Sequence, residues 1–355
     1  MITSKKMKAC VLKDIGQLEY QEVDKPIPKR GEVLVKVKAS GICGSDIARV
    51  LTKGTYHFPT IPGHEFSGEI VEITEGIDPE LLGRKAAIFP LIPCHQCDAC
   101  QIGEYAQCKN YNYFGSRCDG GFAEYVAVPV WNLVLAPDTL TYQEIAMTEP
   151  AAVAIHALRQ GGIEIGDNVV IFGAGPIGIM LGQWARAWGA DKVILVDIDT
   201  NKIDFAKSLG FDLVFNNKNM DVIKCIYDET NCKGADLAIE CAGVSMTLEQ
   251  CFLVLRPFGR AVAMGNPVGE MKLNQKAYWE LLRKQLTLRG TWNSSYVSIP
   301  KNDWELSIRA MESGKLNVKQ LVTHQVKLDD CMKPFLMMEK GLEFFNKVMF
   351  VIDDE

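Results

Sequence analysis

Three groups of residues in this chain of 355 residues have types and spacings suited to chemistry, and the first is a glycine-rich turn. Gly173, Gly175 and Gly178 form a G-x-G-x-x-G sequence between a short apolar run and a stretch with apolar residues at helical spacing. Glycines at such a strand-to-helix turn let the backbone approach a pyrophosphate, whose charge the helix N-terminus attracts. The pattern therefore predicts that these glycines, together with Pro176 and Ile177, bind a dinucleotide.

A carboxylate follows the glycine turn at the distance expected of a ribose-binding residue. A second apolar strand, 193–196, ends at Asp197, about 20 residues after the last glycine. A carboxylate in this place accepts from the ribose 2′-hydroxyl and repels a 2′-phosphate, so Asp197 favours NAD over NADP. Asp199 adds like charge, and Lys202, which we include among the cofactor-binding residues, is too little to reverse the preference. The alternative is a structural turn followed by an ordinary surface Asp.

The second group consists of four cysteines with the spacing C-x2-C-x2-C-x7-C, namely Cys94, Cys97, Cys100 and Cys108. Four thiolates can close a tetrahedron around Zn²⁺ and leave no position open, so the spacing predicts a structural zinc site. An iron–sulfur cluster has comparable cysteine spacing. Four reduced thiols that cluster without a metal are the third interpretation.

The third group joins residues that lie far apart in the sequence. Cys43 follows a predicted strand, His64 lies in a Pro-Gly turn, and Glu149 precedes the predicted dinucleotide-binding region. A lone Cys or His is more often a core or surface residue than a ligand. A dinucleotide domain needs a partner that activates a substrate, however, and Cys, His and a carboxylate form a zinc site with room for water or an alcohol. Asp46 is then the expected acceptor for the ring N–H of His64.

The elements that must position these groups fall into three segments. Residues 1–152 carry short strands between Gly and Pro turns, which predicts a small β barrel or folded sheet. Thr141 and Glu144 form a capping box at the start of a helix near the end of this segment. Residues 153–292 alternate strands and helices, which predicts one doubly wound parallel sheet of six strands. Residues 293–355 are few for an independent core, so we expect them to pack on the N-terminal half.

The predicted strands begin near residue 9 and then comprise 31–39, 68–73, 85–89, 122–128, 169–172, 193–196, 213–215, 237–240, 260–264, 286–289 and 347–352, with late helices at 304–312 and 331–340.

Composition and charge argue against several classes of protein. The net charge of −6 and the absence of a basic stripe predict no nucleic-acid partner. No apolar run reaches the roughly 18 residues of a membrane span, and residues 1–16 lack the apolar run of a signal peptide. The 12 cysteines then indicate metal ligands or free thiols rather than disulfides. We expect a cytoplasmic protein with a small-molecule substrate.

Six motifs stand in one order along nearly the whole chain: Gly-Ile-Cys-Gly-Ser-Asp at 41–46, Gly-His-Glu at 63–65, the four cysteines, Asp-Gly-Gly-Phe-Ala-Glu-Tyr at 119–125, Glu-Pro at 149–150, and the glycine turn. This order resembles the zinc-dependent medium-chain dehydrogenases, the family of alcohol and sorbitol dehydrogenases. The resemblance implies an α/β plus β fold, in which a GroES-like barrel domain, completed by the C-terminal segment, flanks a Rossmann domain, with the active site in the cleft between them.

The resemblance also implies the metals and the catalytic residues. It places a catalytic zinc on Cys43 and His64, with either Glu65 or Glu149 as the carboxylate ligand, and a structural zinc on the cysteines. Ser45 is implied as the first proton acceptor, with His64 and Glu65 as the other catalytic residues. Many relatives continue the proton relay with a histidine where this chain has Ala48, so here the proton must leave by another route.

A carboxylate at position 149 resembles the polyol branch of the family, since alcohol dehydrogenases often carry a cysteine there. We therefore expect the substrate to be a secondary hydroxyl of a sugar-alcohol phosphate, and an unphosphorylated polyol such as sorbitol, or another secondary alcohol, is the alternative. A zinc-free quinone or enoyl reductase of the same fold would lack both ligand sets. Relatives are dimers or tetramers, so we expect a homodimer or homotetramer. Candidate substrate contacts are Arg49, Lys53, Arg117 and Lys284 for a phosphate, and Trp292, Asn293 and Tyr296 for a polyol.

Overall fold

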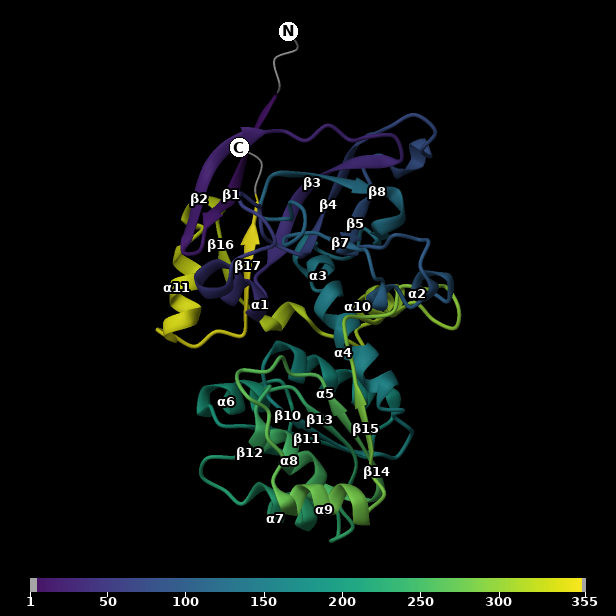
Figure 1. The fold of residues 1–355 in the computed structure, drawn as a ribbon, viewed down its shortest axis with the longest axis vertical. Coiled ribbons are helices and arrows are strands. Elements are labelled where there is room, and N and C mark those ends of the chain that lie inside the picture. Colours follow the sequence, from purple (N-terminus) through teal and green to yellow (C-terminus); the bar gives the residue numbers. More distant parts are fainter. Residues whose placement is uncertain (1–4, 353–355) are drawn as a thin grey trace. The chain divides into compact units, whose positions relative to one another are not determined.

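The computed structural model describes residues 5–352, and the chain divides into two compact units. The first unit comprises Met1–Pro150 and Ser295–Glu355, and the second comprises Ala151–Ser294. In Figure 1 the purple strands from the start of the chain and the yellow strands from its end belong to the same unit. The chain therefore leaves the first unit once, builds the second, and returns.

The second unit contains one parallel six-stranded sheet in the order β12-β11-β10-β13-β14-β15. The order reverses between β10 and β13, as in a doubly wound dinucleotide-binding fold, and such folds bind ligands at the carboxyl ends of the strands beside this reversal. The strands are β10 (Asn168–Phe172), β11 (Lys192–Asp197), β12 (Val214–Asn216), β13 (Ala235–Glu240), β14 (Leu255–Ala263) and β15 (Thr287–Gly290).

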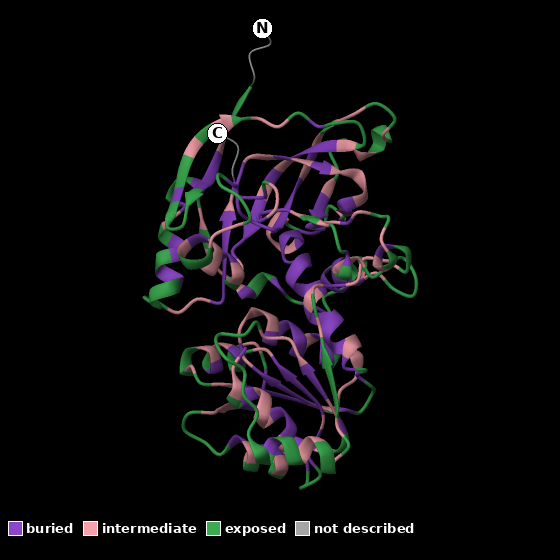
Figure 2. Ribbon diagram, viewed as in Figure 1, coloured by how far each residue is buried: buried purple, intermediate pink, exposed green. Residues whose placement is uncertain are grey.

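Helices connect these strands, and the central strands are buried on both faces. Val170 and Phe172 of β10 and Ile194 of β11 are fully buried in one apolar cluster. Figure 2 shows the same strands in purple within a shell of partly exposed helices. The helices are α4 (Thr148–Gln160), α5 (Pro176–Trp188), α6 (Thr200–Ser208), α7 (Val222–Glu229), α8 (Ser245–Val254) and α9 (Gln275–Arg283).

The first unit is built on a seven-stranded sheet in the order β16-β17-β3-β4-β5-β9, with β8 paired to β3. The C-terminal strand β17 runs antiparallel to β3 with Met349 opposite Gly41, so the end of the chain completes a sheet begun near its start. The strands are β3 (Glu32–Gly41), β4 (Glu65–Ile73), β5 (Lys85–Ile88), β8 (Tyr125–Pro129), β9 (Leu133–Leu135), β16 (Val322–Val326) and β17 (Lys347–Val351).

Two strand pairs complete the first unit, and some of its strands are absent from the sequence-based expectations. β2 and β16 were not predicted, because most of their side chains are polar and partly exposed, so neither shows a clear alternation. The pairs are β1 (Lys6–Asp14) with β2 (Gln17–Asp24), and β6 (Leu91–Ile92) with β7 (Asn112–Tyr113).

Aromatic packing joins the C-terminal segment to the N-terminal strands. The Phe122 ring lies 4.8 Å from the Phe350 ring and 6.1 Å from the Phe335 ring, measured between centroids. The predicted capping box is confirmed, since the Glu144 N–H donates to Thr141 Oγ1 and the Thr141 N–H donates to Glu144.

The α- and π-helices of this unit are α1 (Gly44–Ala48), η1 (Arg49–Lys53, a π-helical turn), α2 (Asp98–Gln101), α3 (Tyr142–Ala146), α10 (Asp303–Glu312) and α11 (Lys333–Lys340). Its 3-10 turns are η2 (Pro79–Leu81), η3 (Tyr105–Gln107), η4 (Val130–Asn132), η5 (Lys319–Leu321) and η6 (Leu328–Asp330). Among the described residues, no helix has the length and apolar character needed to cross a bilayer.

Candidate active site

Strand register brings Cys43, His64 and Glu65 together. Gly41 ends β3 and pairs with Glu65, the first residue of β4. Cys43 lies just beyond β3, and His64 immediately precedes β4. One sulfur, one ring nitrogen and one carboxylate oxygen from these residues lie within 4.8 Å of one another. A thiolate, an imidazole and a carboxylate are ligands of zinc sites that keep a fourth position for water or substrate, so the residues fit a catalytic zinc.

A buried carboxylate supports this cluster from α1. Asp46 Oδ1 lies 3.3 Å from His64 Nδ1, and Asp46 Oδ2 accepts from the Cys43 N–H at 3.0 Å. The Arg49 guanidinium also donates to Asp46. Burial opposes ionisation of Asp46, but the charges of His64 and Arg49 outweigh it and lower its pKa to about 2. Asp46 therefore lies where it can orient the imidazole and leave Nε2 for a metal.

A second buried charge, which sequence analysis did not identify, lies against Glu65. Lys347, the first residue of β17, forms an ion pair with the Glu65 carboxylate, and both side chains are at most 5% exposed. Burial lowers the pKa of Lys347, but the charge of Glu65 outweighs it and raises the pKa. A β carbon at Gly41 would collide with both groups, so any other residue there would displace this ion pair. The only feature of the sequence that could have indicated a role for Lys347 is its position at the start of an otherwise apolar closing strand.

Glu149 supplies another carboxylate near the cluster. It lies in the first turn of α4 and is buried. Burial and the charge of Glu65 raise its pKa to about 7. Its oxygens are not among the three ligand atoms that lie within 4.8 Å of one another. Of the two carboxylates that the sequence nominated, the structure groups Glu65 with the thiol and the imidazole, and leaves Glu149 beside them.

Two hydroxyl-bearing side chains accompany the cluster. Ser45 is half-buried in the first turn of α1, and its hydroxyl has no hydrogen-bond partner within residues 5–352. Tyr113 of β7 places its ring centroid 5.9 Å from that of His64. Burial and the charge of Glu149 raise the pKa of Tyr113. Sequence analysis did not single out Tyr113, since nothing local to it indicates that β7 faces the cluster.

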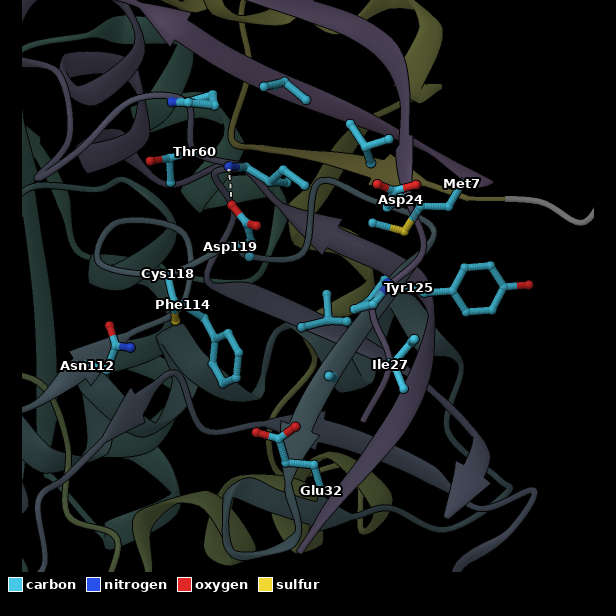
Figure 3. A pocket seen from close by; sticks show the side chains of 18 of the residues that line it. Met7, Asp24, Ile27, Glu32, Thr60, Asn112, Phe114, Cys118, Asp119 and Tyr125 are labelled. Atoms are coloured by element: carbon cyan, nitrogen blue, oxygen red, sulfur yellow. Dashed lines mark hydrogen bonds between the residues drawn. The ribbon is translucent and has the colours of Figure 1, made fainter. Parts of the chain in front are cut away.

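A cavity of about 530 Å³ in the first unit is a separate feature, because no candidate metal ligand lines it. Strands β1 and β2, together with β7 and the residues that follow it up to Gly120, form part of its wall (Figure 3). Two of its carboxylates accept from the backbone and the third pairs with a lysine: Asp119 accepts from the Ile61 N–H at 2.9 Å, Glu32 accepts from the Lys29 N–H at 2.8 Å, and Asp24 pairs with Lys6. These polar groups stabilise neighbouring loops, so we assign no chemistry to the cavity.

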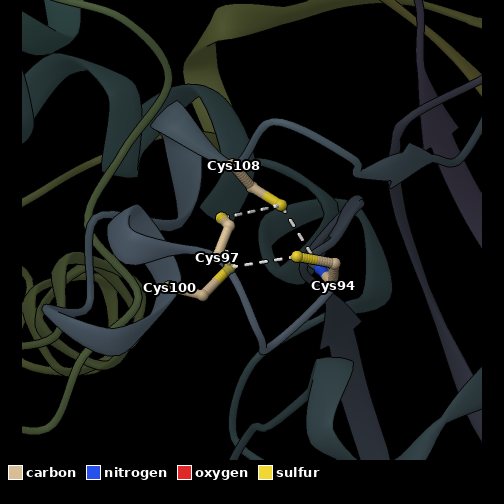
Figure 4. A group of neighbouring side chains, drawn as sticks. All are labelled: Cys94, Cys97, Cys100 and Cys108. Atoms are coloured by element: carbon tan, nitrogen blue, oxygen red, sulfur yellow. Dashed lines mark hydrogen bonds between the residues drawn. The ribbon is translucent and has the colours of Figure 1, made fainter.

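The side chains of the four-cysteine lobe point toward one another in Figure 4, and Cys100 lies within α2. The sulfur–sulfur distances are 3.5 Å for Cys97–Cys100 and 3.9 Å for Cys94–Cys100 and Cys97–Cys108. Four sulfurs bound tetrahedrally to zinc at about 2.3 Å would lie about 3.8 Å apart. The thiols therefore fit a single ion, and their spacing leaves no room for the several irons and sulfides of a cluster. All four cysteines are free of disulfides.

The thiols of this lobe differ in acidity. Hydrogen bonding from the Lys109 N–H, followed by that from the Cys100 N–H, lowers the pKa of Cys97 to about 6. Burial raises the pKa of Cys100 to about 12. A thiol surrounded by backbone N–H donors, as Cys97 is, readily becomes the thiolate that a metal requires.

The predicted glycine turn lies between β10 and α5 in the second unit. A β carbon at Gly178 would collide with the carbonyl oxygen of Gly173, so the helix can start this close to the turn only with glycine there. A β carbon at Gly175 would meet no atom within 4 Å, and Pro176 and Ile177 are half-exposed in the first turn of α5. The N-terminus of a 13-residue helix thus faces open space, which fits a pyrophosphate.

Asp197 ends β11 beside this turn. Its Oδ2 accepts from the Ala174 N–H at 2.7 Å, and its Oδ1 accepts from the N–H groups of Ile198 and Asp199. The carboxylate therefore fixes the glycine turn, and its half-exposed position leaves lone pairs for a ribose. Lys202 is half-buried in the first turn of α6, one helical turn after Asp199.

Several other residues nominated from the sequence have structural partners. Lys284 pairs with Glu280 and donates to the carbonyls of Leu253 and Leu255, so its ammonium group already has partners in the second unit. The Tyr296 hydroxyl donates to the carbonyl of Trp131 at 3.0 Å, and its ring stacks on Phe89. Tyr296 therefore has a structural role within the first unit, where it packs against Phe89 and Trp131.

Comparisons with known proteins agree with this geometry. Residues 29–138 match the family model for the alcohol dehydrogenase GroES-like domain, and residues 176–313 match that for zinc-binding dehydrogenases. Galactitol 1-phosphate 5-dehydrogenase of Escherichia coli K12 is 35% identical over 299 residues, which cover 84% of this chain and 86% of the relative. Sorbitol dehydrogenase of Bacillus subtilis is 30% identical over 353 residues, which cover 98% and 96%.

Solved structures of dehydrogenases also superpose on nearly the whole chain. Galactitol-1-phosphate dehydrogenase from Escherichia coli superposes with a TM-score of 0.91 at 33% identity, covering 97% of this chain and 100% of that one. An alcohol dehydrogenase from E. coli CFT073, solved with NADH, superposes with a TM-score of 0.88 at 28% identity, covering 98% and 99%. The predicted fold class, a GroES-like domain with a doubly wound domain, is confirmed.

Proposed function

Because the chain belongs to the zinc-dependent medium-chain dehydrogenase family, we propose that it oxidises a secondary hydroxyl of a sugar-alcohol phosphate. At the level of the family it is an alcohol or polyol dehydrogenase, and its cofactors are zinc and NAD(H). The observation that carries the proposal is the meeting of Cys43, His64 and Glu65 within 4.8 Å, since an open zinc site has no structural purpose.

The proposed substrate is galactitol 1-phosphate, and the product is a ketose 6-phosphate such as tagatose 6-phosphate. The support is the 35% identity, over 84% of the chain, to an enzyme named for this substrate. An unphosphorylated polyol is the second candidate, because a sorbitol dehydrogenase is 30% identical over 98% of the chain.

The residues of the first unit divide the work of the reaction. Zinc, when held by Cys43, His64 and Glu65, supplies the Lewis acidity that lowers the pKa of the substrate hydroxyl. Ser45 Oγ, free of other partners within residues 5–352, accepts the hydroxyl proton as it releases its own proton to solvent. NAD, when held by the second unit, would accept the hydride, the hydrogen with its electron pair, that leaves the same carbinol carbon. Ala48 offers no relay group, so the proton departs from Ser45 by a route without a histidine at that position.

The remaining charges hold the reacting groups in place. Asp46 orients the His64 ring, and Lys347 neutralises Glu65 and fixes its position. Glu149 is a second carboxylate that can replace Glu65 as a metal ligand. The four-cysteine lobe has no open position, and we propose that its zinc stabilises residues 94–108 and takes no part in the reaction.

The second unit is proposed to bind NAD through Gly173, Gly175, Pro176, Ile177 and Gly178. The Asp197 carboxylate accepts from the ribose 2′-hydroxyl and disfavours NADP. Asp197→Asn removes the charge but keeps an oxygen acceptor for the Ala174 N–H. We expect the preference for NAD over NADP to fall by roughly tenfold or more in steady-state kinetics. A variant that kept the wild-type preference would remove Asp197 from this role.

A substrate panel tests the proposed reaction. Zinc-loaded enzyme is mixed with NAD and with hexitols that do or do not carry a phosphate, and NADH formation is recorded. We expect kcat/KM for galactitol 1-phosphate to exceed that for galactitol by roughly tenfold or more. A preference for free polyols would contradict the phosphorylated substrate and leave the family and the polyol dehydrogenase activity in place.

A further inference from the structure

A phosphate group on the substrate requires a cation that is not already neutralised. Among the cations that the sequence nominated, Arg49 donates to the buried Asp46, and Lys284 pairs with Glu280 in the second unit. Lys53 is exposed at the end of η1. Arg117 differs from the first two, because no carboxylate within residues 5–352 forms an ion pair with it. It also differs from Lys53, because it is partly buried.

Two tyrosines enclose the Arg117 side chain. Its guanidinium carbon lies 4.1 Å from the Tyr56 ring centroid and 4.3 Å from the Tyr111 ring centroid. Its Nε atom is buried and has no hydrogen-bond partner among the described residues. Burial lowers the pKa of Arg117, but its interactions with Tyr56 and Tyr111 outweigh this effect and raise the pKa. Stacked rings restrict the rotamers of the side chain and leave the guanidinium edge for an anion.

The backbone links this cation to the candidate metal cluster. The Arg117 N–H donates to the Tyr113 carbonyl at 2.9 Å, within one tight turn. Tyr113 lies against His64, and its ring centroid is 6.3 Å from that of Tyr111. The Arg117 carbonyl lies 3.2 Å from His57 Nε2, which connects this turn to the loop that carries Tyr56. The cation is therefore held on the tight turn that follows Tyr113, whose ring lies against His64.

We propose that Arg117 is the specificity-determining residue that binds the phosphate of the substrate, an inference that rests on the proposed phosphorylated polyol. The guanidinium edge donates two hydrogen bonds to phosphate oxygens, a geometry that a lysine cannot reproduce. A substrate held by its phosphate at Arg117 and by a hydroxyl at the metal is fixed at two points. An unphosphorylated polyol lacks the contact with Arg117 and is held only at the metal.

The test measures kcat and KM of zinc-loaded enzyme for galactitol 1-phosphate and for galactitol. In Arg117→Gln we expect KM for the phosphate ester to rise roughly ten- to a hundredfold, with KM for galactitol unchanged. Arg117→Lys should recover only part of the loss. Inorganic phosphate, which should inhibit the wild type competitively, should inhibit Arg117→Gln much less. Arg84→Gln removes an exposed arginine of the first unit that has no assigned role and is the matched control, expected to behave as wild type. Zinc content and melting temperature establish that each variant is folded.

The outcomes separate this inference from the proposed function. If the wild type prefers the phosphate ester and Arg117→Gln keeps that preference, another cation binds the phosphate and the inference is wrong. An equal rise in KM for both substrates would also overturn the inference, since Arg117 would then support the site without binding the phosphate. If the wild type shows no preference for the ester and no inhibition by phosphate, the proposed substrate itself fails. Should Arg117→Gln not fold, Tyr56→Leu removes one enclosing ring at an exposed position, and a rise in KM for the ester alone is expected there too.

Discussion

The two candidate metal sites differ in how the chain assembles them. The lobe takes all four cysteines from residues 94–108, and its sulfurs lie 3.5–3.9 Å apart where they are in contact. The other site takes Cys43, His64 and Glu65 from the ends of two paired strands. In addition, it depends on buried charges from elsewhere, among them Lys347 near the end of the chain.

This difference indicates what each site is built for. A closed set of like ligands needs little support, because the metal satisfies every donor. An open set of unlike ligands must hold its geometry while one position exchanges, so neighbouring charges such as Asp46 and Lys347 take over part of the positioning. We therefore expect lobe substitutions to affect stability and substitutions at the open site to affect catalysis.

The largest expected effect is loss of the lobe. In Cys100→Ser a buried ligand is removed, and the free energy of unfolding should fall by on the order of 5 kcal/mol or more, because metal binding and folding of such a lobe are coupled. Metal analysis should find one zinc per chain instead of two, and denaturant unfolding gives the stability. Cys232→Ser, at an exposed thiol outside both sites, is the control. Two retained zinc ions with wild-type stability would contradict the structural assignment.

Cys43→Ser should show the opposite pattern. The lobe zinc remains and the chain stays folded, but the open site loses its thiolate ligand. Turnover should fall on the order of a thousandfold, equivalent to about 4 kcal/mol of transition-state stabilisation. Steady-state kinetics and metal analysis measure the two effects. Wild-type turnover with only the lobe zinc present would mean that the reaction does not use this site.

The same difference explains what could be predicted from the sequence. The glycine turn, the cysteine lobe and the Thr141–Glu144 capping box are local, so the spacing of a few residues determines their geometry. The central strands of the parallel sheet were located because apolar runs buried on both faces are distinctive. In these regions local pattern and tertiary structure agree.

The open site could not be completed from sequence, because its details depend on pairing between distant segments. Spacing did not decide between Glu65 and Glu149, whereas the register of Gly41 with Glu65 places Glu65 beside Cys43. Lys347 was missed for the same reason, since only the pairing of β17 with β3 carries it to Glu65. The resemblance to a family supplied the ligand set, and the structure supplied the partners.

Lys347→Met tests whether the open site depends on its buried ion pair. In protein whose open site holds no zinc, removing one partner leaves the Glu65 charge buried and unpaired, which should destabilise the protein by about 3–5 kcal/mol. Denaturant unfolding measures this loss. Adding Glu65→Gln to the same chain removes the orphaned charge, so the double variant should regain most of the stability. Equal stability of Lys347→Met and wild type would show that the pair contributes little.

The smallest of these effects is expected at Ser45, because its hydroxyl takes part only in proton transfer. Ser45→Ala should lower turnover roughly a hundredfold, a typical contribution of one positioned proton-transfer group. Stability should not change, since no described residue hydrogen-bonds this hydroxyl, and the chain should keep two zinc ions. Ser45→Thr keeps a hydroxyl at the same place and should retain more of the activity. If Ser45→Ala turned over at the wild-type rate, the proton would have to leave through another group of the open site. The open site would then differ from the cysteine lobe only in its ligands and in the buried charges around them.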